Sequence, residues 1–292
     1  MTRAAVSTGM ELEFETFGSP DDEALLLVMG FTAQLTVWPD DLCKGLAGRG
    51  LYVIRFDNRD CGLSTKFDGV EVDMAAVMSA FLSGSPLPTP PYTLSDMAAD
   101  GIALLDHLGI ERAHIMGASM GGMIVQQMAI EHPTRVRSLI SVMSTTGEPE
   151  YGQADPGALL ALLTPPPSDR EGYIDAAPRY LIFGSKKYGD PTEAKLRAAR
   201  DYDRSFYPQG APRQMAAIVA AGSRADGLRA LRVPTLVIHG RDDTLISQGG
   251  GLRTAELIEG ANLLLVGDMG HDMPPPLIPM MIDAIASHTS LA

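Results

Sequence analysis

The chain has 292 residues, which is enough for one large α/β domain or for a core domain with an insertion. Its net charge of −13 argues against nucleic acid and anionic membrane surfaces as partners. Apolar runs such as 24–29 are too short to span a membrane, and the N-terminus lacks the apolar stretch of a secretory signal. Because the only cysteines, Cys43 and Cys61, form no disulfide framework, we expect a soluble protein of the cytoplasm.

The first third of the chain predicts strands of a sheet and one helix. Residues 11–17 alternate apolar and acidic side chains, which is typical of a half-exposed antiparallel strand. The continuous apolar run 24–29 indicates a strand that is buried on both faces of a parallel sheet. A helix is predicted over 39–46, and a second buried strand over 51–56.

The pattern weakens from residue 66 to residue 91, where four prolines exclude a regular helix: Pro86, Pro88, Pro90 and Pro91. Ser95 is predicted to be the N-cap of the next helix. The apolar residues of that helix share one face: Ala98, Ile102, Leu105 and Leu108. A strand and a helix on either side of Ser119 follow, and 136–143 is predicted as a further buried strand.

The character of the sequence changes between residues 147 and 231. This segment contains three consecutive prolines, several short helical patterns and no strong strand pattern, so we expect a helical cap insertion. Strands are predicted again over 234–239 and 262–266, before a last helix over 276–287. Alternating strands and helices predict an α/β fold with a mostly parallel sheet flanked by helices. Its core would comprise residues 1–146 and 232–292.

The motif Gly117-Ala118-Ser119-Met120-Gly121 lies between an apolar run and an apolar helical pattern. This strand–turn–helix context is typical of a serine nucleophile. A serine at so tight a turn is strained, and glycines at 117 and 121 avoid the side-chain clashes. The following helix directs its free N–H groups and the positive end of its dipole at the site. Taken alone, the motif is also compatible with a glycine-rich turn that only packs closely.

A serine hydroxyl needs a base, and the base needs an acid that orients it. Asp243 and His271 lie in loops that follow the two last predicted strands, in the order nucleophile, acid, base. Ligand sites of open α/β sheets lie at the carboxyl ends of such strands. The spacing from Gly240 favours Asp243, but Asp242 stays open as the acid, and His239 is interpreted as structural.

An oxyanion hole requires two N–H donors that point at the developing charge. The first is predicted to be the backbone N–H of Met120, next to the nucleophile. The second is predicted to be the N–H of Phe31, after the strand 24–29, where Gly30 allows the chain to turn back towards Ser119.

These motifs resemble the α/β-hydrolase fold family over nearly the whole chain. The resemblance is carried by five segments: Val28-Met29-Gly30-Phe31, the loop from Phe56 to Ser64, Gly117 to Gly122, Gly240 to Asp243, and Met269-Gly270-His271. Within the family, Leu27-Val28-Met29-Gly30, Trp38-Pro39 and the Arg55 to Asp60 loop resemble actinobacterial esterases of the aclacinomycin methylesterase type. Met29 is a departure, since many relatives carry histidine there.

The resemblance implies a triad of Ser119, Asp243 and His271, with Phe31 and Met120 as oxyanion donors. It also implies that the loop after 51–56 is architectural. We interpret Asp57 and Arg59 as supports for the loops around the site, because an acid and an arginine so close usually form a structural ion pair.

The sequence therefore predicts hydrolysis of a carboxylic ester through an acyl-enzyme, with neither a metal nor another cofactor. The cap would shape a pocket for a small to medium, uncharged substrate, with tentative lining residues Gly30, Met143, Met215 and Met273. Lactone, thioester or phospholipid hydrolysis and perhydrolysis use the same three residues and stay open. So do a small-molecule receptor with little turnover and a homo-oligomer, whereas dehalogenation is disfavoured because it needs a carboxylate in place of Ser119.

Overall fold

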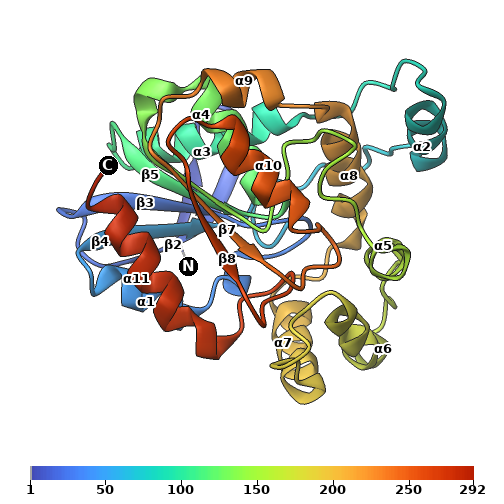
Figure 1. Cartoon of the computed structure of the whole chain (residues 1–292). Coiled ribbons are helices and arrows are strands. Elements are labelled where there is room, and N and C mark those ends of the chain that lie inside the picture. Colours follow the sequence, from blue (N-terminus) through green and yellow to red (C-terminus); the bar gives the residue numbers. More distant parts are fainter. Residues whose placement is uncertain (1) are drawn as a thin grey trace.

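Eight strands form one central sheet in the computed structural model, which describes residues 2–292 apart from the side chain of Leu82. Across the sheet they lie in the order β1-β2-β4-β3-β5-β6-β7-β8 (Figure 1). In chain order the strands are β1 (Thr2–Ala5), β2 (Glu11–Phe17), β3 (Glu23–Val28), β4 (Leu51–Phe56), β5 (Ala113–Ala118), β6 (Val136–Val142), β7 (Thr235–Gly240) and β8 (Asn262–Val266).

The sheet is parallel except at one edge. Strand β2 runs antiparallel to β1 and to β4, as its alternating sequence predicted, and β4, β3, β5, β6, β7 and β8 are parallel neighbours. Strand β1 was not predicted. Its four residues are mostly exposed, and a short edge strand of this kind has no clear hydrophobic pattern.

Helices cover both faces of the sheet (Figure 1). On one face α1 packs against α11, and on the other α3 packs against α4, with α9 and α10 beside them. The α-helices are α1 (Asp40–Ala47), α2 (Met74–Ser83), α3 (Leu94–His107), α4 (Met120–Glu131), α5 (Pro156–Leu163), α6 (Arg170–Ala176), α7 (Pro191–Arg204), α8 (Ala211–Ala221), α9 (Ala225–Ala230), α10 (Gly249–Leu257) and α11 (Ile278–Thr289). Among the described residues, none of the helices is both long and apolar enough to cross a membrane.

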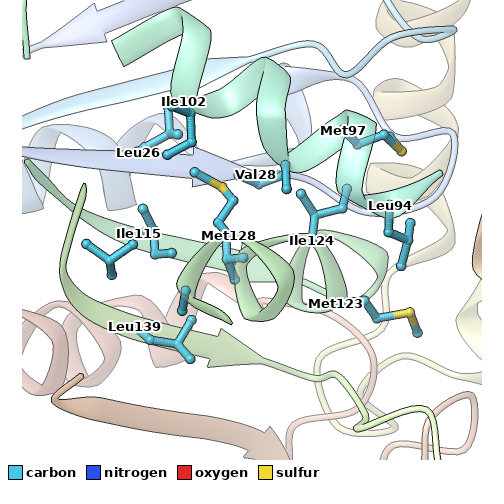
Figure 2. Packing of buried hydrophobic residues seen from close by; sticks show 14 of the residues in the cluster. Leu26, Val28, Leu94, Met97, Ile102, Ile115, Met123, Ile124, Met128 and Leu139 are labelled. Atoms are coloured by element: carbon cyan, nitrogen blue, oxygen red, sulfur yellow. The ribbon is translucent and has the colours of Figure 1, made fainter. Parts of the chain in front are cut away.

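The hydrophobic core has two halves, one on each side of the sheet. Leu26 and Val28 of β3 point to the face that α3 and α4 cover, where they meet Ile102 and Met128 (Figure 2). The intervening Leu27 points to the opposite face, towards α1 and α11. Successive residues of a strand face opposite sides, so a strand with both faces covered needs an unbroken apolar run.

Two local predictions around α3 were wrong. The N-cap of α3 is Thr93, whose side chain accepts a hydrogen bond from the N–H of Asp96 while Asp96 accepts one from the N–H of Thr93. Ser95 lies inside the helix and donates instead to Glu131 at 2.7 Å. The segment 66–91 also contains a helix, α2, which ends at Gly84 in the left-handed region before the first of the four prolines.

The segment between β6 and β7 is helical, as predicted. Helices α5, α6 and α7 lie together at one end of the molecule, and α8 lies close to α2 (Figure 1). Helix α9 contacts α4 and α10, and its Leu228 belongs to the hydrophobic core on that face of the sheet.

Candidate active site

Ser119 lies at the turn between β5 and α4, with φ 57° and ψ −121°. This is a strained backbone conformation for a residue with a side chain. A Cβ atom at Gly117 would lie 2.0 Å from the carbonyl oxygen of Gly121, and a Cβ atom at Gly121 would lie 2.0 Å from that of Val28. Both glycines are therefore required for the turn that exposes Ser119 at the start of a helix.

His271 and Asp243 are joined by a hydrogen bond. They follow β8 and β7, and His271 Nδ1 lies 2.7 Å from Asp243 Oδ2. The other carboxylate oxygen of Asp243 accepts hydrogen bonds from the N–H groups of Leu245 and Ile246, both at 2.9 Å. Asp242 makes no such contact among the described residues: its N–H donates to Met269, and its carboxylate lies 3.9 Å from Arg241.

The environment of Asp243 keeps its buried side chain ionised. Burial by itself raises the pKa of this carboxyl, but the charge of His271 and hydrogen bonds from His239 and His271 outweigh it. The result is a pKa lowered to about 2. An ionised Asp243 favours the tautomer that carries its proton on His271 Nδ1, and in that tautomer Nε2 has the free lone pair that a base requires.

His239, for which the sequence predicts a structural role, also contacts the acid. It is completely buried at the end of β7, and its Nε2 lies 2.8 Å from the carbonyl oxygen of Ile246 and 3.5 Å from Asp243 Oδ2. In the sequence, only the spacing of four residues between His239 and Asp243 hints at this contact. That spacing does not show that the loop after β7 folds back onto the end of the strand.

The loop after β3 lies against Ser119. A Cβ atom at Gly30 would be 3.0 Å from Ser119 Cβ and 3.5 Å from Ser119 Oγ. Within residues 2–292, neither the N–H of Phe31 nor that of Met120 has a hydrogen-bond acceptor in the protein. Two unused N–H donors next to a serine are the groups that an oxyanion requires.

Phe183, at the end of a 3₁₀ turn in the segment between β6 and β7, contacts His271 in two ways. The N–H of His271 donates to the carbonyl oxygen of Phe183 at 2.7 Å. The two rings meet edge to face with their centroids 6.0 Å apart. Sequence reasoning missed Phe183, because nothing in its local pattern distinguishes it from other aromatic residues of the segment.

The three methionines that were predicted to line a pocket lie in different surroundings. Met143 follows β6 in the core, with a positive φ of 41°. Met273 packs against the edge of the same cluster, and Met215 is half-buried on α8. A cavity of about 450 Å³ opens near the amino ends of β5, β6 and β7, and neither Gly30 nor any of these methionines lines it.

Asp57 and Arg59 each form an ion pair, but not with one another. Asp57 lies 2.8 Å from Arg204 of α7 and accepts hydrogen bonds from the N–H groups of Leu35 and Leu63. Arg59 makes two contacts of 2.7 Å with Asp100 of α3. Both residues thus link loops at the carboxyl edge of the sheet, with partners that are distant in the sequence.

Known proteins resemble this chain in sequence and in fold. A family model described as alpha/beta hydrolase fold matches residues 23–274. A rhodomycin D methylesterase, DauP, from Streptomyces sp. (strain C5) is 25% identical over 100% of this chain and 99% of its own. A putative carbamate hydrolase, RutD, from Variovorax paradoxus (strain S110) is 28% identical over 90% of each chain. The crystal structure of the enol-lactonase from Burkholderia xenovorans LB400 superposes with a TM-score of 0.75 at 23% identity, covering 99% of this chain and 100% of the other.

Proposed function

Because the chain belongs to the α/β-hydrolase fold family, we propose that it is a serine esterase that cleaves carboxylic esters through an acyl-enzyme. The observation that carries the proposal is the hydrogen bond between His271 and the buried carboxylate of Asp243, on the same edge of the sheet as the strained turn at Ser119. The similarity to a methylesterase supports an ester as the substrate.

In the proposed mechanism, His271 Nε2 removes the proton of Ser119 Oγ as the oxygen attacks the ester carbonyl. The N–H groups of Phe31 and Met120 bind the oxyanion of the tetrahedral intermediate. His271 then protonates the departing alcohol, leaving Ser119 acylated. Next it activates a water molecule that releases the acid. Asp243 holds the imidazole and stabilises its charged form, and no step requires a metal or another cofactor.

The cap, for which we propose the extent 147–231, supplies the substrate side of the site. Phe183 supports this assignment, because its carbonyl oxygen and its ring both contact His271. We propose a small to medium, uncharged substrate, with Gly30, Met143, Met215 and Met273 as candidate contacts. Cys43 and Cys61 are free and buried, which fits a reducing compartment such as the cytoplasm.

Labelling with a fluorophosphonate probe and peptide mapping tests the proposal directly, because such probes react with activated serines. We expect the label on Ser119 and steady turnover of a series of p-nitrophenyl esters. Ser119→Ala should lower kcat by about 10⁵-fold or more and leave the circular dichroism spectrum and Tm unchanged. A label on another serine, or turnover by Ser119→Ala, would refute the assignment. A single burst of product without turnover would instead identify a receptor that is acylated once.

A further inference from the structure

Gln214 of α8 joins two loops at the carboxyl edge of the sheet. Its side chain is fully buried, and its Oε1 accepts a hydrogen bond from the N–H of Thr32 at 2.8 Å. Its Nε2 donates to the carbonyl oxygen of Arg59 at 3.0 Å. Burying an amide is costly unless it is hydrogen-bonded. Both ends of this amide are used, one on the loop after β3 and the other on the loop after β4.

Thr32 is a residue that needs an external contact to hold its conformation. Its φ of 54° places a β-branched residue in the left-handed region, which is strained. Such a conformation persists only when the surroundings hold it. Thr32 directly follows Phe31, so the hydrogen bond that the Thr32 N–H donates to Gln214 also restrains the peptide next to the unused Phe31 N–H. The same short loop approaches Ser119 through Gly30.

The start of α8 is itself firmly attached to the loop after β4. Arg213, the residue before Gln214, binds Asp60 through two contacts of 2.7 and 2.9 Å, and both side chains are buried. At Gly210 the two segments are so close that a Cβ atom would lie 2.2 Å from the carbonyl oxygen of Asp60. Gln214 is therefore held on a fixed base from which it can restrain Thr32.

We propose that Gln214 is a positioning residue for ester hydrolysis: it holds the loop of Gly30, Phe31 and Thr32 so that the Phe31 N–H meets the oxyanion. This inference rests on the proposed function. The oxyanion exists only in the transition state and the tetrahedral intermediate, so a displaced donor lowers kcat and leaves substrate binding largely unchanged.

The test is Gln214→Met, which keeps the length of the side chain and removes both the acceptor and the donor. With p-nitrophenyl acetate we expect kcat to fall about 10- to 100-fold, less than the loss of a whole oxyanion donor, while KM stays within about threefold. The affinity for a boronic acid that mimics the tetrahedral intermediate should fall by the same factor as kcat/KM.

Gln126→Met is the matched control, because Gln126 is equally buried and bonded to Ser141 and Arg224. It should lower Tm without the selective fall in kcat. An unchanged kcat in Gln214→Met, or equal losses of kcat in both variants, would overturn the inference.

If Gln214→Met does not fold, Gln214→Asn, whose shorter amide cannot reach both partners, serves in its place. A wild-type protein that the fluorophosphonate does not label would refute the proposed function itself, whereas a labelled wild type with an unaffected variant refutes only the role of Gln214.

Discussion

At the scale of single residues, both carboxylate oxygens of Asp243 have hydrogen-bond partners. One oxygen accepts from the two N–H groups of its own loop, and the other lies 2.7 Å from His271 Nδ1 and 3.5 Å from His239 Nε2. In Asp243→Asn one of these oxygens becomes an NH₂ group, so either the loop or the imidazole loses its partner. We expect kcat/KM to fall by about 10³- to 10⁴-fold, as measured with p-nitrophenyl acetate.

Asp242→Asn is the control for this prediction, since Asp242 is the adjacent residue and, within residues 2–292, its side chain forms neither a hydrogen bond nor an ion pair with His271. We expect its kcat/KM to stay within about threefold of the wild type, because the half-exposed Asp242 side chain has no such buried partners. If Asp242→Asn proved the more damaging change, the acid of the triad would be Asp242.

The lowered pKa of Asp243 also predicts how stability depends on pH. Its folded pKa of about 2 lies below the usual aspartate pKa of 3.8. The ionised carboxylate therefore stabilises the fold above pH 3.8, and this contribution is lost as the pH falls through about 2. In urea denaturation, the stability advantage of the wild type over Asp243→Asn should shrink by about 1–2 kcal/mol between pH 6 and pH 2.5. An advantage that stays constant or grows on acidification would contradict it.

At the scale of elements, the start of α3 depends on a reciprocal pair of hydrogen bonds between Thr93 and Asp96. Thr93→Ala removes the acceptor for the N–H of Asp96, so we expect the free energy of unfolding to fall by about 1 kcal/mol. Ser95→Ala, two residues later, should change stability by less than half as much, because it loses only an exposed hydrogen bond to Glu131. Denaturant titration of both variants measures the two losses of stability. A larger loss in Ser95→Ala than in Thr93→Ala would identify Ser95 as the N-cap.

Periodicity predicted the buried strands well and the peripheral elements poorly. The expected strand 51–56 coincides with β4, because a strand covered on both faces needs an unbroken apolar run. Helix α2 was missed because its apolar residues lie on all sides of the helix, and among its described side chains only Val77 is well buried. The N-cap of α3 was misplaced because serine and threonine both cap well, and the deciding bond to Asp96 requires the actual geometry.

The candidate site could be predicted only as far as chain order allows. Ser119, Asp243 and His271 each follow a strand, so topology alone places them on one edge of the sheet. Phe183 and Gln214 lie in the segment between β6 and β7, and their contacts span 88 and 182 positions in the sequence. Local patterns carry no information on contacts of that length, and so both residues emerge only from the fold.

Backbone strain is concentrated on the same edge. Among the described residues other than glycine, those with positive φ are Thr32, Asp60, Ser119, Met143 and Asp268. Each lies in the turn or loop that leaves the carboxyl end of a different strand, namely β3, β4, β5, β6 and β8. Strained residues persist where surrounding contacts over-determine them, and they cluster at functional sites. Their distribution supports this edge as the site independently of residue chemistry.

At the scale of the whole molecule, buried charges connect the segment between β6 and β7 to the core. Arg204 of α7 pairs with Asp57 and Arg213 of α8 pairs with Asp60, and both carboxylates are almost completely buried. Arg224 donates to Gln126 of α4 and to Thr145, and burial lowers its pKa to about 10. A charge that stays buried after its partner is removed is strongly destabilising, so we expect substitution of one member of such a pair to weaken the packing of this segment on the core.

Two arginine–aspartate pairs share the same bidentate geometry and differ in burial. Arg213 and Asp60 meet at 2.7 and 2.9 Å in the interior, whereas Arg170 and Asp203 meet at 2.7 and 2.8 Å on the surface of the cap. Arg213→Met leaves Asp60 buried with only its hydrogen bonds from Tyr92 and Phe67. We expect it to lower the free energy of unfolding by about 3–5 kcal/mol.

Arg170→Met removes an equally well-formed pair from a place where water solvates both charges. We therefore expect the unfolding midpoint of Arg170→Met to stay close to that of the wild type. Any part of the wild-type stability that this pair contributes should be weakened by salt, and that part should be missing in the variant. Parallel denaturation of the two variants at low and high salt separates geometry from burial as the source of stability. Equal losses in both variants would mean that the cap is held to the core by contacts other than the buried charges, and that Asp60 is stabilised without Arg213.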